Sequence, residues 1–274
     1  MPAPKKEKED GITFYYPINT LTLSVTGSAC ALKCRHCAGL FLQPMKSIEN
    51  LFKDGEPDLP ENITSVLASG GCNADGAVPV TAQRDSLIKL KDKGLRLNVH
   101  TGLPYPDTID GIISFSDVIS FDFITNDEVI REVYGLNKQG SDYVSAYLSL
   151  LQACSLIETA GNSLRSTPVS RSKTFHSFMN FFMEPEDLFH VSKNMNALAS
   201  VRPSAFGPSF SALHSPRLVP HITIGLYGGK IKGEAEAIEK LARIGADRIV
   251  FNVFMPRKGT DYANKTPPDA EEVK

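Results

Sequence analysis

Short apolar runs alternate along the chain with segments whose apolar residues recur near the 3.6-residue period of a helix. The runs have the length and the content of branched and aromatic residues that are typical of buried strands. They lie at 21–25, 65–69, 95–100, 117–124, 221–226 and 248–254. Helices are predicted at 38–52, 81–93, from 106 onward, at 141–154 and at 233–244. This alternation favours an α/β fold in which right-handed helical crossovers join parallel strands.

The interval between the predicted strands changes once. The first four strands begin at about 21, 65, 95 and 117, but the fifth does not begin until about 219. Residues 155–217 are rich in serine and lack a clear period, so three interpretations compete: a surface insertion or lid, a disordered segment, or sequence foreign to the domain. The last two are favoured. We therefore predict a partial (βα)6 TIM-like barrel over 11–274, with a long irregular insertion before strand five.

Both ends of the chain and its overall composition limit the class of protein. Residues 1–10 carry mixed charges without an apolar core, so they are predicted to be a disordered tail rather than a signal peptide. The chain stops where a sixth helix would begin, which suggests a truncated C-terminus. The net charge of −2 argues against a broad nucleic-acid-binding surface. No apolar run is long enough to predict a membrane span.

Three of the five cysteines lie within eight residues, directly after the first predicted strand. Cys30, Cys34 and Cys37 have the spacing C-x3-C-x2-C. Three thiolates on one loop can hold three corners of a cubane [4Fe–4S] cluster and leave the fourth iron open. A closed zinc site would need a fourth ligand at a similar distance, and none is evident nearby in the sequence. The odd number and close spacing of the cysteines argue against disulfides, and accessible thiols favour a reducing compartment, by default the cytoplasm.

Glycine turns and polar residues follow the other predicted strands. In a parallel βα barrel the working residues gather where the strands end, at the C-terminal face. The segments that follow the strands are the cysteine loop, Gly70-Gly71-Cys72, His100-Thr101-Gly102, residues 122–127, residues 225–229 and residues 252–259. The pattern therefore predicts that cysteines, glycine turns and polar groups share one rim.

The cysteine loop resembles the signature of the radical S-adenosylmethionine superfamily, in which an aromatic-type residue, here His36, precedes the last cysteine. The resemblance implies a [4Fe–4S] cluster on Cys30, Cys34 and Cys37. It also implies that the open iron binds the amino and carboxylate groups of S-adenosylmethionine, with His36 against the adenine edge. Reductive cleavage of that cofactor would yield a 5′-deoxyadenosyl radical that abstracts hydrogen from a substrate.

Other features of the superfamily match single positions of this sequence. Gly70-Gly71 resembles the glycine turn whose backbone approaches the methionine amino group, and Cys72 stands where many members carry an acidic residue. Asp122 matches the acidic group that contacts the ribose hydroxyls. Gly225 matches the glycine that lets the backbone pass near adenine. These roles are implied by the resemblance.

Within the superfamily, three segments are similar in sequence to the biotin synthase-like group, which includes archaeal-type lipoyl synthases. These segments are 24–27, 219–225 and 252–260. The similarity implies sulfur insertion into a small-molecule or lipoyl/octanoyl-type substrate. It further implies an electron donor such as ferredoxin or flavodoxin and a second radical S-adenosylmethionine subunit. The rival hypothesis is a non-catalytic iron–sulfur protein, either an electron carrier or a degenerate barrel. The glycine turns favour the enzyme, because an electron carrier needs no cofactor cradle.

For several residues the sequence leaves two interpretations open. Cys72 is a cluster or substrate ligand or, preferably, a small residue that lines the cofactor pocket. His100 is a proton donor or substrate contact, or a hydrogen-bonded structural histidine. Asp122 binds cofactor, or Asp122 and Asp127 together cap a turn. Cys154 is expected to be structural, and His221, placed at the start of strand five, is given no role.

Overall fold

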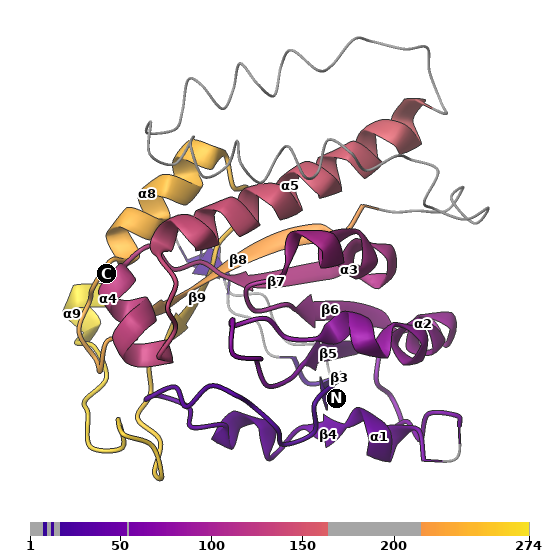
Figure 1. Cartoon of the computed structure of the whole chain (residues 1–274), viewed down its shortest axis with the longest axis horizontal. Coiled ribbons are helices and arrows are strands. Elements are labelled where there is room, and N and C mark those ends of the chain that lie inside the picture. Colours follow the sequence, from indigo (N-terminus) through magenta and orange to yellow (C-terminus); the bar gives the residue numbers. More distant parts are fainter. Residues whose placement is uncertain (1–7, 10–11, 14–16, 54, 164–214, 274) are drawn as a thin grey trace.

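The computed structural model describes residues 8–9, 12–13, 17–53, 55–163 and 215–273 (Figure 1). Its main element is a seven-stranded sheet in which every neighbouring pair is parallel. In spatial order the strands are β4 (Lys46–Ser47), β3 (Thr20–Ser24), β5 (Ser65–Ser69), β6 (Arg96–His100), β7 (Val118–Asp122), β8 (Arg217–Ile224) and β9 (Val250–Val253). A separate antiparallel ladder pairs β1 (Lys8–Glu9) with β2 (Ile12–Thr13).

Helices connect the strands of the large sheet. They are η1 (Leu40–Leu42), α1 (Ile48–Leu51), η2 (Val80–Gln83), α2 (Arg84–Asp92), η3 (Pro106–Thr108), α3 (Ile109–Phe115), α4 (Asp127–Val129), the π-helical η4 (Ile130–Tyr134), α5 (Gly140–Ser163), α8 (Glu234–Ile244) and α9 (Ala270–Val273). Figure 1 shows α2, α3 and α5 in succession beside the sheet. No helix of the described residues is long and apolar enough to cross a membrane.

The strand order confirms the predicted α/β fold. The six predicted strands correspond to β3, β5, β6, β7, β8 and β9, and they lie side by side in chain order, as in a barrel built from βα units. The sheet is open within the described residues, with β4 and β9 at its edges. The short strand β4 is an addition that the sequence pattern did not reveal.

The two faces of the sheet differ in character. On β5 and β6 alternate residues such as Val66, Ala68, Leu97 and Val99 are fully buried in the hydrophobic core. That core also takes in apolar side chains of α2, α3 and α5. The intervening residues are only partly buried, and several are polar. Because successive side chains in a strand point to opposite faces, the polar set shares the face away from the main core. The candidate site lies on this face.

Two predicted elements need correction. The predicted helix at 38–52 is instead η1, β4 and α1, because Pro44 cannot continue a helix and Gly39 adopts a φ of +75°. The irregular segment at 155–217 begins with helix, since α5 continues to Ser163 and buries Ile157 one turn beyond Cys154. It also ends inside β8. Residues 164–214, and with them most of the proposed insertion, lie outside the described residues, as does most of the predicted tail.

Candidate active site

The cysteine loop is shaped by its own backbone. Where β3 ends, Ser24 Oγ donates to the carbonyl of Gly27 at 2.7 Å, and Gly27 takes a φ of +59° that suits glycine. Further along, the amides of Cys37 and Ala38 both donate to the Cys34 carbonyl, at 3.0 and 2.8 Å. These local bonds hold the three cysteines on one tight loop at the carboxyl end of β3.

The turn after β5 packs directly on this loop. The amide of Gly71 donates to Thr26 Oγ1 at 2.7 Å, and the amide of Ala31 donates to the Cys72 carbonyl at 2.8 Å. A Cβ atom at position 71 would lie 1.9 Å from the Ala29 carbonyl oxygen and 2.6 Å from Cys30 Cα. Only glycine therefore permits the contact. The close approach at Gly71 is thus made to the cysteine loop.

Cys72 joins the three loop cysteines. Burial, helped by the negative charges of Cys30, Asp122 and Cys37, raises the pKa of the Cys72 thiol to about 12. Burial likewise raises the pKa of Cys34 to about 12, with Cys37, Cys72 and Cys30 adding to the effect. Cys72 therefore lies near the loop cysteines in space, although no fourth ligand is evident near them in the sequence. Parallel β3 and β5 end in register, with Ser24 opposite Ser69, a proximity that the linear sequence hides.

The donor set can be tested against candidate metals. Among the described residues, no group of three or more His, Cys, Asp or Glu is arranged to hold a single metal ion. A cubane makes a different demand, because it binds each thiolate through a separate iron and so spaces its ligands more widely. Soft thiols gathered on the cysteine loop suit such a cluster, and iron would release the thiol protons that burial retains.

A cavity of about 550 Å³ opens beside the cysteine loop. Its lining includes His36, Phe41, Asp122, Tyr134, Thr223, Leu226 and residues 252–257. The His36 ring packs edge-on against Tyr134 at 5.4 Å between centroids. Its Nδ1 atom is buried and has no hydrogen-bond partner among the described residues. Burial lowers the pKa of His36 to about 4, only partly opposed by Asp122, so the ring is neutral near pH 7. An unpartnered nitrogen at the cavity wall fits a bound cofactor with polar edges.

Asp122 lies between this cavity and a pair of histidines. His100 Nε2 is 3.2 Å from Asp122 Oδ2, and His100 Nδ1 is 3.3 Å from Ser69 Oγ. The rings of His100 and His221 stack with centroids 6.4 Å apart. Burial alone would raise the pKa of Asp122, but His100 outweighs it and the value falls to about 2. Burial opposes protonation of His100, yet Asp122 overcomes it and raises that pKa.

Two expectations about these residues are corrected. His221 lies inside β8 rather than at its start, because the strand begins at Arg217 and continues through Pro220. Its register partner is Asp122, and its pKa is lowered by burial. Asp122 does not cap the following turn. That role belongs to Asn126, whose Oδ1 accepts from the amides of Glu128 and Val129 at 3.1 Å each.

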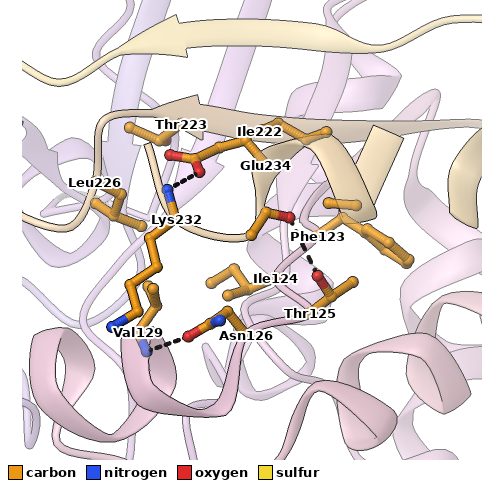
Figure 2. A pocket seen from close by; sticks show the side chains of 12 residues that line it. Phe123, Ile124, Thr125, Asn126, Val129, Ile222, Thr223, Leu226, Lys232 and Glu234 are labelled. Atoms are coloured by element: carbon orange, nitrogen blue, oxygen red, sulfur yellow. Dashed lines mark hydrogen bonds between the residues drawn. The ribbon is translucent and has the colours of Figure 1, made fainter. Parts of the chain in front are cut away.

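The loop after β8 is organised by a buried carboxylate, as Figure 2 shows. Glu234, 7% exposed, accepts from the amides of Gly225, at 2.9 Å, and Lys232. The neighbouring cavity of about 20 Å³ offers room for a water rather than a cofactor. Gly225 itself has a φ of +74°, and a Cβ there would lie 2.8 Å from Pro268. Its close neighbour in this structure is therefore the C-terminal segment.

The C-terminal segment returns over the site. The amide of Tyr262 donates to the Arg35 carbonyl at 3.2 Å, and the guanidinium of Arg257 lies 4.7 Å from the centre of the Phe41 ring. Arg257, Phe41 and Tyr134 line the main cavity but were not among the predicted site residues. For Arg257 the sequence held two signals, its place in 252–259 after the sixth predicted strand and the similarity of 252–260 to the biotin synthase-like group.

No protein-family model matches the chain, and no curated protein matches it. Among solved structures the chain is similar to methylornithine synthase (PylB), with a TM-score of 0.50 and 11% sequence identity. The match covers 89% of this chain and 56% of that enzyme, so the chain spans little more than half of its length. At this identity the likeness shows a shared α/β fold.

Proposed function

We propose that the chain is a radical S-adenosylmethionine enzyme, with a [4Fe–4S] cluster held by Cys30, Cys34 and Cys37. The observation that carries this proposal is the convergence of the cysteine loop, the Gly71 contact and the cavity at one end of the sheet. When bound, the cluster supplies the electron that cleaves S-adenosylmethionine and so starts hydrogen abstraction from the substrate. The similarity to methylornithine synthase (PylB) supports the assignment through the shared fold alone.

The chain's own residues bind and orient the cofactor in this proposal. His36 remains neutral and offers its free Nδ1 to a polar edge of the adenine. Asp122 remains ionised at neutral pH and offers a carboxylate oxygen at the cavity wall to ribose hydroxyls. The Gly70-Gly71 turn, fixed on the cysteine loop, brings its backbone close to the position of the methionine moiety. Phe41 and Tyr134 help to exclude water.

The reaction we propose is sulfur insertion of the biotin synthase or lipoyl synthase kind, on a small-molecule or lipoyl/octanoyl-type substrate. Its support is the similarity of segments 219–225 and 252–260, which contribute Thr223, Asn252 and Arg257 to the cavity. The guanidinium of Arg257 suits an anionic group of a substrate or cofactor. An electron donor such as ferredoxin or flavodoxin, a second radical S-adenosylmethionine subunit and a cytoplasmic setting belong to the same proposal.

The decisive experiment separates an enzyme from a non-catalytic iron–sulfur protein. Anaerobically reconstituted protein should bind about four irons and four sulfides per chain, and with reductant and S-adenosylmethionine it should form 5′-deoxyadenosine. Cys34→Ala should abolish both. Cys154→Ala is the matched control, because Cys154 belongs to α5 and is buried in the core, and it should retain both. A retained cluster without 5′-deoxyadenosine would favour the electron carrier instead.

A further inference from the structure

His100 is held by three neighbouring strands. It is the last residue of β6, and Ser69 and Asp122 are the last residues of β5 and β7 on either side of it. The Nδ1 atom of His100 lies 3.3 Å from Ser69 Oγ, and Nε2 lies 3.2 Å from Asp122 Oδ2. The ring also stacks on His221 of β8, at 16° from parallel. Strands of the sheet, rather than loops, therefore fix both nitrogens and one face of the imidazole.

The two carboxylate oxygens of Asp122 have different surroundings. Oδ2 faces His100, whereas no described residue donates a hydrogen bond to Oδ1. Of the two residues, Asp122 lines the main cavity and His100 does not. The side chains of His100 and Asp122 are 28% and 32% exposed, so a ligand in the cavity can reach the carboxylate. Asp122 thus has one oxygen anchored by the sheet and one available for binding.

We infer that His100 is a positioning residue for the cofactor, which fixes Asp122 Oδ2 and so presents Oδ1 to the ribose hydroxyls. The inference rests on the proposed function, because it requires Asp122 to accept hydrogen bonds from the ribose. A carboxylate held at one oxygen keeps one rotamer, and a locked rotamer loses less freedom when the ligand binds. His100 also holds the pKa of Asp122 at about 2 against its burial, so the acceptor stays charged and makes the stronger hydrogen bond.

The pH dependence of binding can be assigned to His100 alone. Burial opposes its protonation, but Asp122 raises its pKa above the ordinary 6.5, and the imidazolium is lost as pH rises through that value. Five further groups feel the charge of Asp122: His221, His36, Cys72, Tyr134 and Tyr143. Burial lowers the pKa values of these two histidines and raises those of the thiol and the tyrosines, so all five stay neutral between pH 6.5 and 10.

The test compares two nucleosides that differ only in the ribose hydroxyls. Adenosine and 2′,3′-dideoxyadenosine both lack the amino-acid end that would bind iron. Their dissociation constants are measured by equilibrium dialysis against the anaerobically reconstituted full chain, and the ratio of the two constants is the diol preference. At pH 6.5 wild type should prefer adenosine by at least about tenfold, the effect of one hydrogen bond to a charged group. This preference should fall as pH rises through the raised His100 value.

Two variants separate the ring nitrogens of His100. The amide of asparagine reaches the place of Nδ1, so His100→Asn keeps the contact with Ser69 but loses Asp122. The amide of glutamine reaches the place of Nε2, so His100→Gln keeps the contact with Asp122 but carries no charge. His100→Asn should lose most of the diol preference at every pH. His100→Gln should keep an intermediate preference that stays constant between pH 6.5 and 10. Asp110→Asn, on α3, is the control and should behave as wild type.

The possible results separate this inference from the proposed function. A full diol preference in His100→Asn, or a wild-type profile as flat as that of His100→Gln, would overturn the positioning role alone. Equal affinity of wild type for both nucleosides, or no binding of either, would overturn the ribose role of Asp122 and this inference with it. The cluster is measured separately, by iron and sulfide content. The wild-type pH profile needs no variant, so it decides the question even where His100→Asn unfolds.

Discussion

The cysteine loop and the histidine cluster lie near each other, but they are assembled in different ways. The loop takes Cys30, Cys34 and Cys37 from one short stretch and shapes them with its own backbone hydrogen bonds. The histidine cluster, defined here as Ser69, His100, Asp122 and His221, takes one residue from each of β5, β6, β7 and β8. Its members meet only because those four strands are neighbours in the sheet.

The two regions also differ in how they handle charge. The cysteine loop, together with Cys72, gathers thiols whose charged forms repel one another, so burial and mutual repulsion keep Cys34 and Cys72 protonated. The histidine cluster compensates its own charge, because the Asp122 carboxylate faces the His100 imidazole at 3.2 Å. The buried thiols of Cys34 and Cys72 therefore ionise only when a cation binds beside them. The histidine cluster already holds groups of opposite charge side by side.

The largest loss of stability and of iron binding should follow when the contact between the turn after β5 and the cysteine loop is disrupted. Gly71→Ala would place a Cβ 1.9 Å from the Ala29 carbonyl, and backbone rather than a flexible side chain would have to move. Overpacking of this kind costs roughly 1–3 kcal/mol of unfolding free energy, and occasionally more. Urea denaturation should show that loss, and iron binding on reconstitution should fall with it.

The control for Gly71→Ala is Gly111→Ala. Gly111 lies inside α3, where an added Cβ would meet only the Thr81 methyl group at 3.2 Å. Alanine in a helix interior gains up to about 1 kcal/mol over glycine, which offsets this contact. Gly111→Ala should therefore unfold at the same urea concentration as wild type and bind as much iron on reconstitution. Equal losses in both variants would show that the Gly71 contact has no special importance for the loop.

The contrast between the two regions explains what the sequence alone could predict. The cysteine motif is local, so the residue order is enough to predict Cys30, Cys34 and Cys37 as one group. The strand order was also predictable, because each apolar run is separated from the next by a helix in a chain with right-handed crossovers. Both kinds of prediction depend on neighbours in sequence.

Contacts set by strand register were not predictable in the same way. Cys72 reaches the loop cysteines because Ser69 lies opposite Ser24, and His221 reaches Asp122 because β8 extends back through Pro220 to Arg217. A shift of the strand boundary by a few residues changes which side chains meet, and boundaries are the least certain part of sequence patterns. The role of Asn126 as a helix cap was not predicted.

An intermediate loss of stability is expected when the Asp122 carboxylate, which compensates the charge of His100, is removed. In wild type the raised pKa of His100 contributes stability that is full below the ordinary histidine value of 6.5 and is lost as pH rises through the raised value. The lowered pKa of Asp122 contributes stability that is full above the ordinary value of 3.8 and is lost as pH falls toward about 2. Asp122→Asn removes both contributions. Burial then acts alone on His100 and should lower its pKa below 6.5.

Histidine NMR titration measures this change directly. The His100 resonance should titrate above 6.5 in wild type and below 6.5 in Asp122→Asn. The stability of wild type relative to the variant should correspondingly shrink as pH rises through the raised His100 value. Asp110→Asn is the matched control, since Asp110 lies on α3 and is not among the groups that act on His100. Titration of His100 at the same pH in wild type and Asp122→Asn would contradict the ion pair.

The smallest effect should come from Ser69, the residue where the two regions meet. Its hydroxyl lies 3.3 Å from His100 Nδ1, while its backbone continues into the Gly70-Gly71 turn that packs on the cysteine loop. Ser69→Ala removes one long hydrogen bond and leaves the backbone unchanged, so it should cost about 0.5–1.5 kcal/mol of unfolding free energy. Iron content after reconstitution should equal that of wild type. If Ser69→Ala lowered iron content as far as Gly71→Ala does, the histidine cluster would prove to support the cysteine loop, and the two regions would have to be treated as one site.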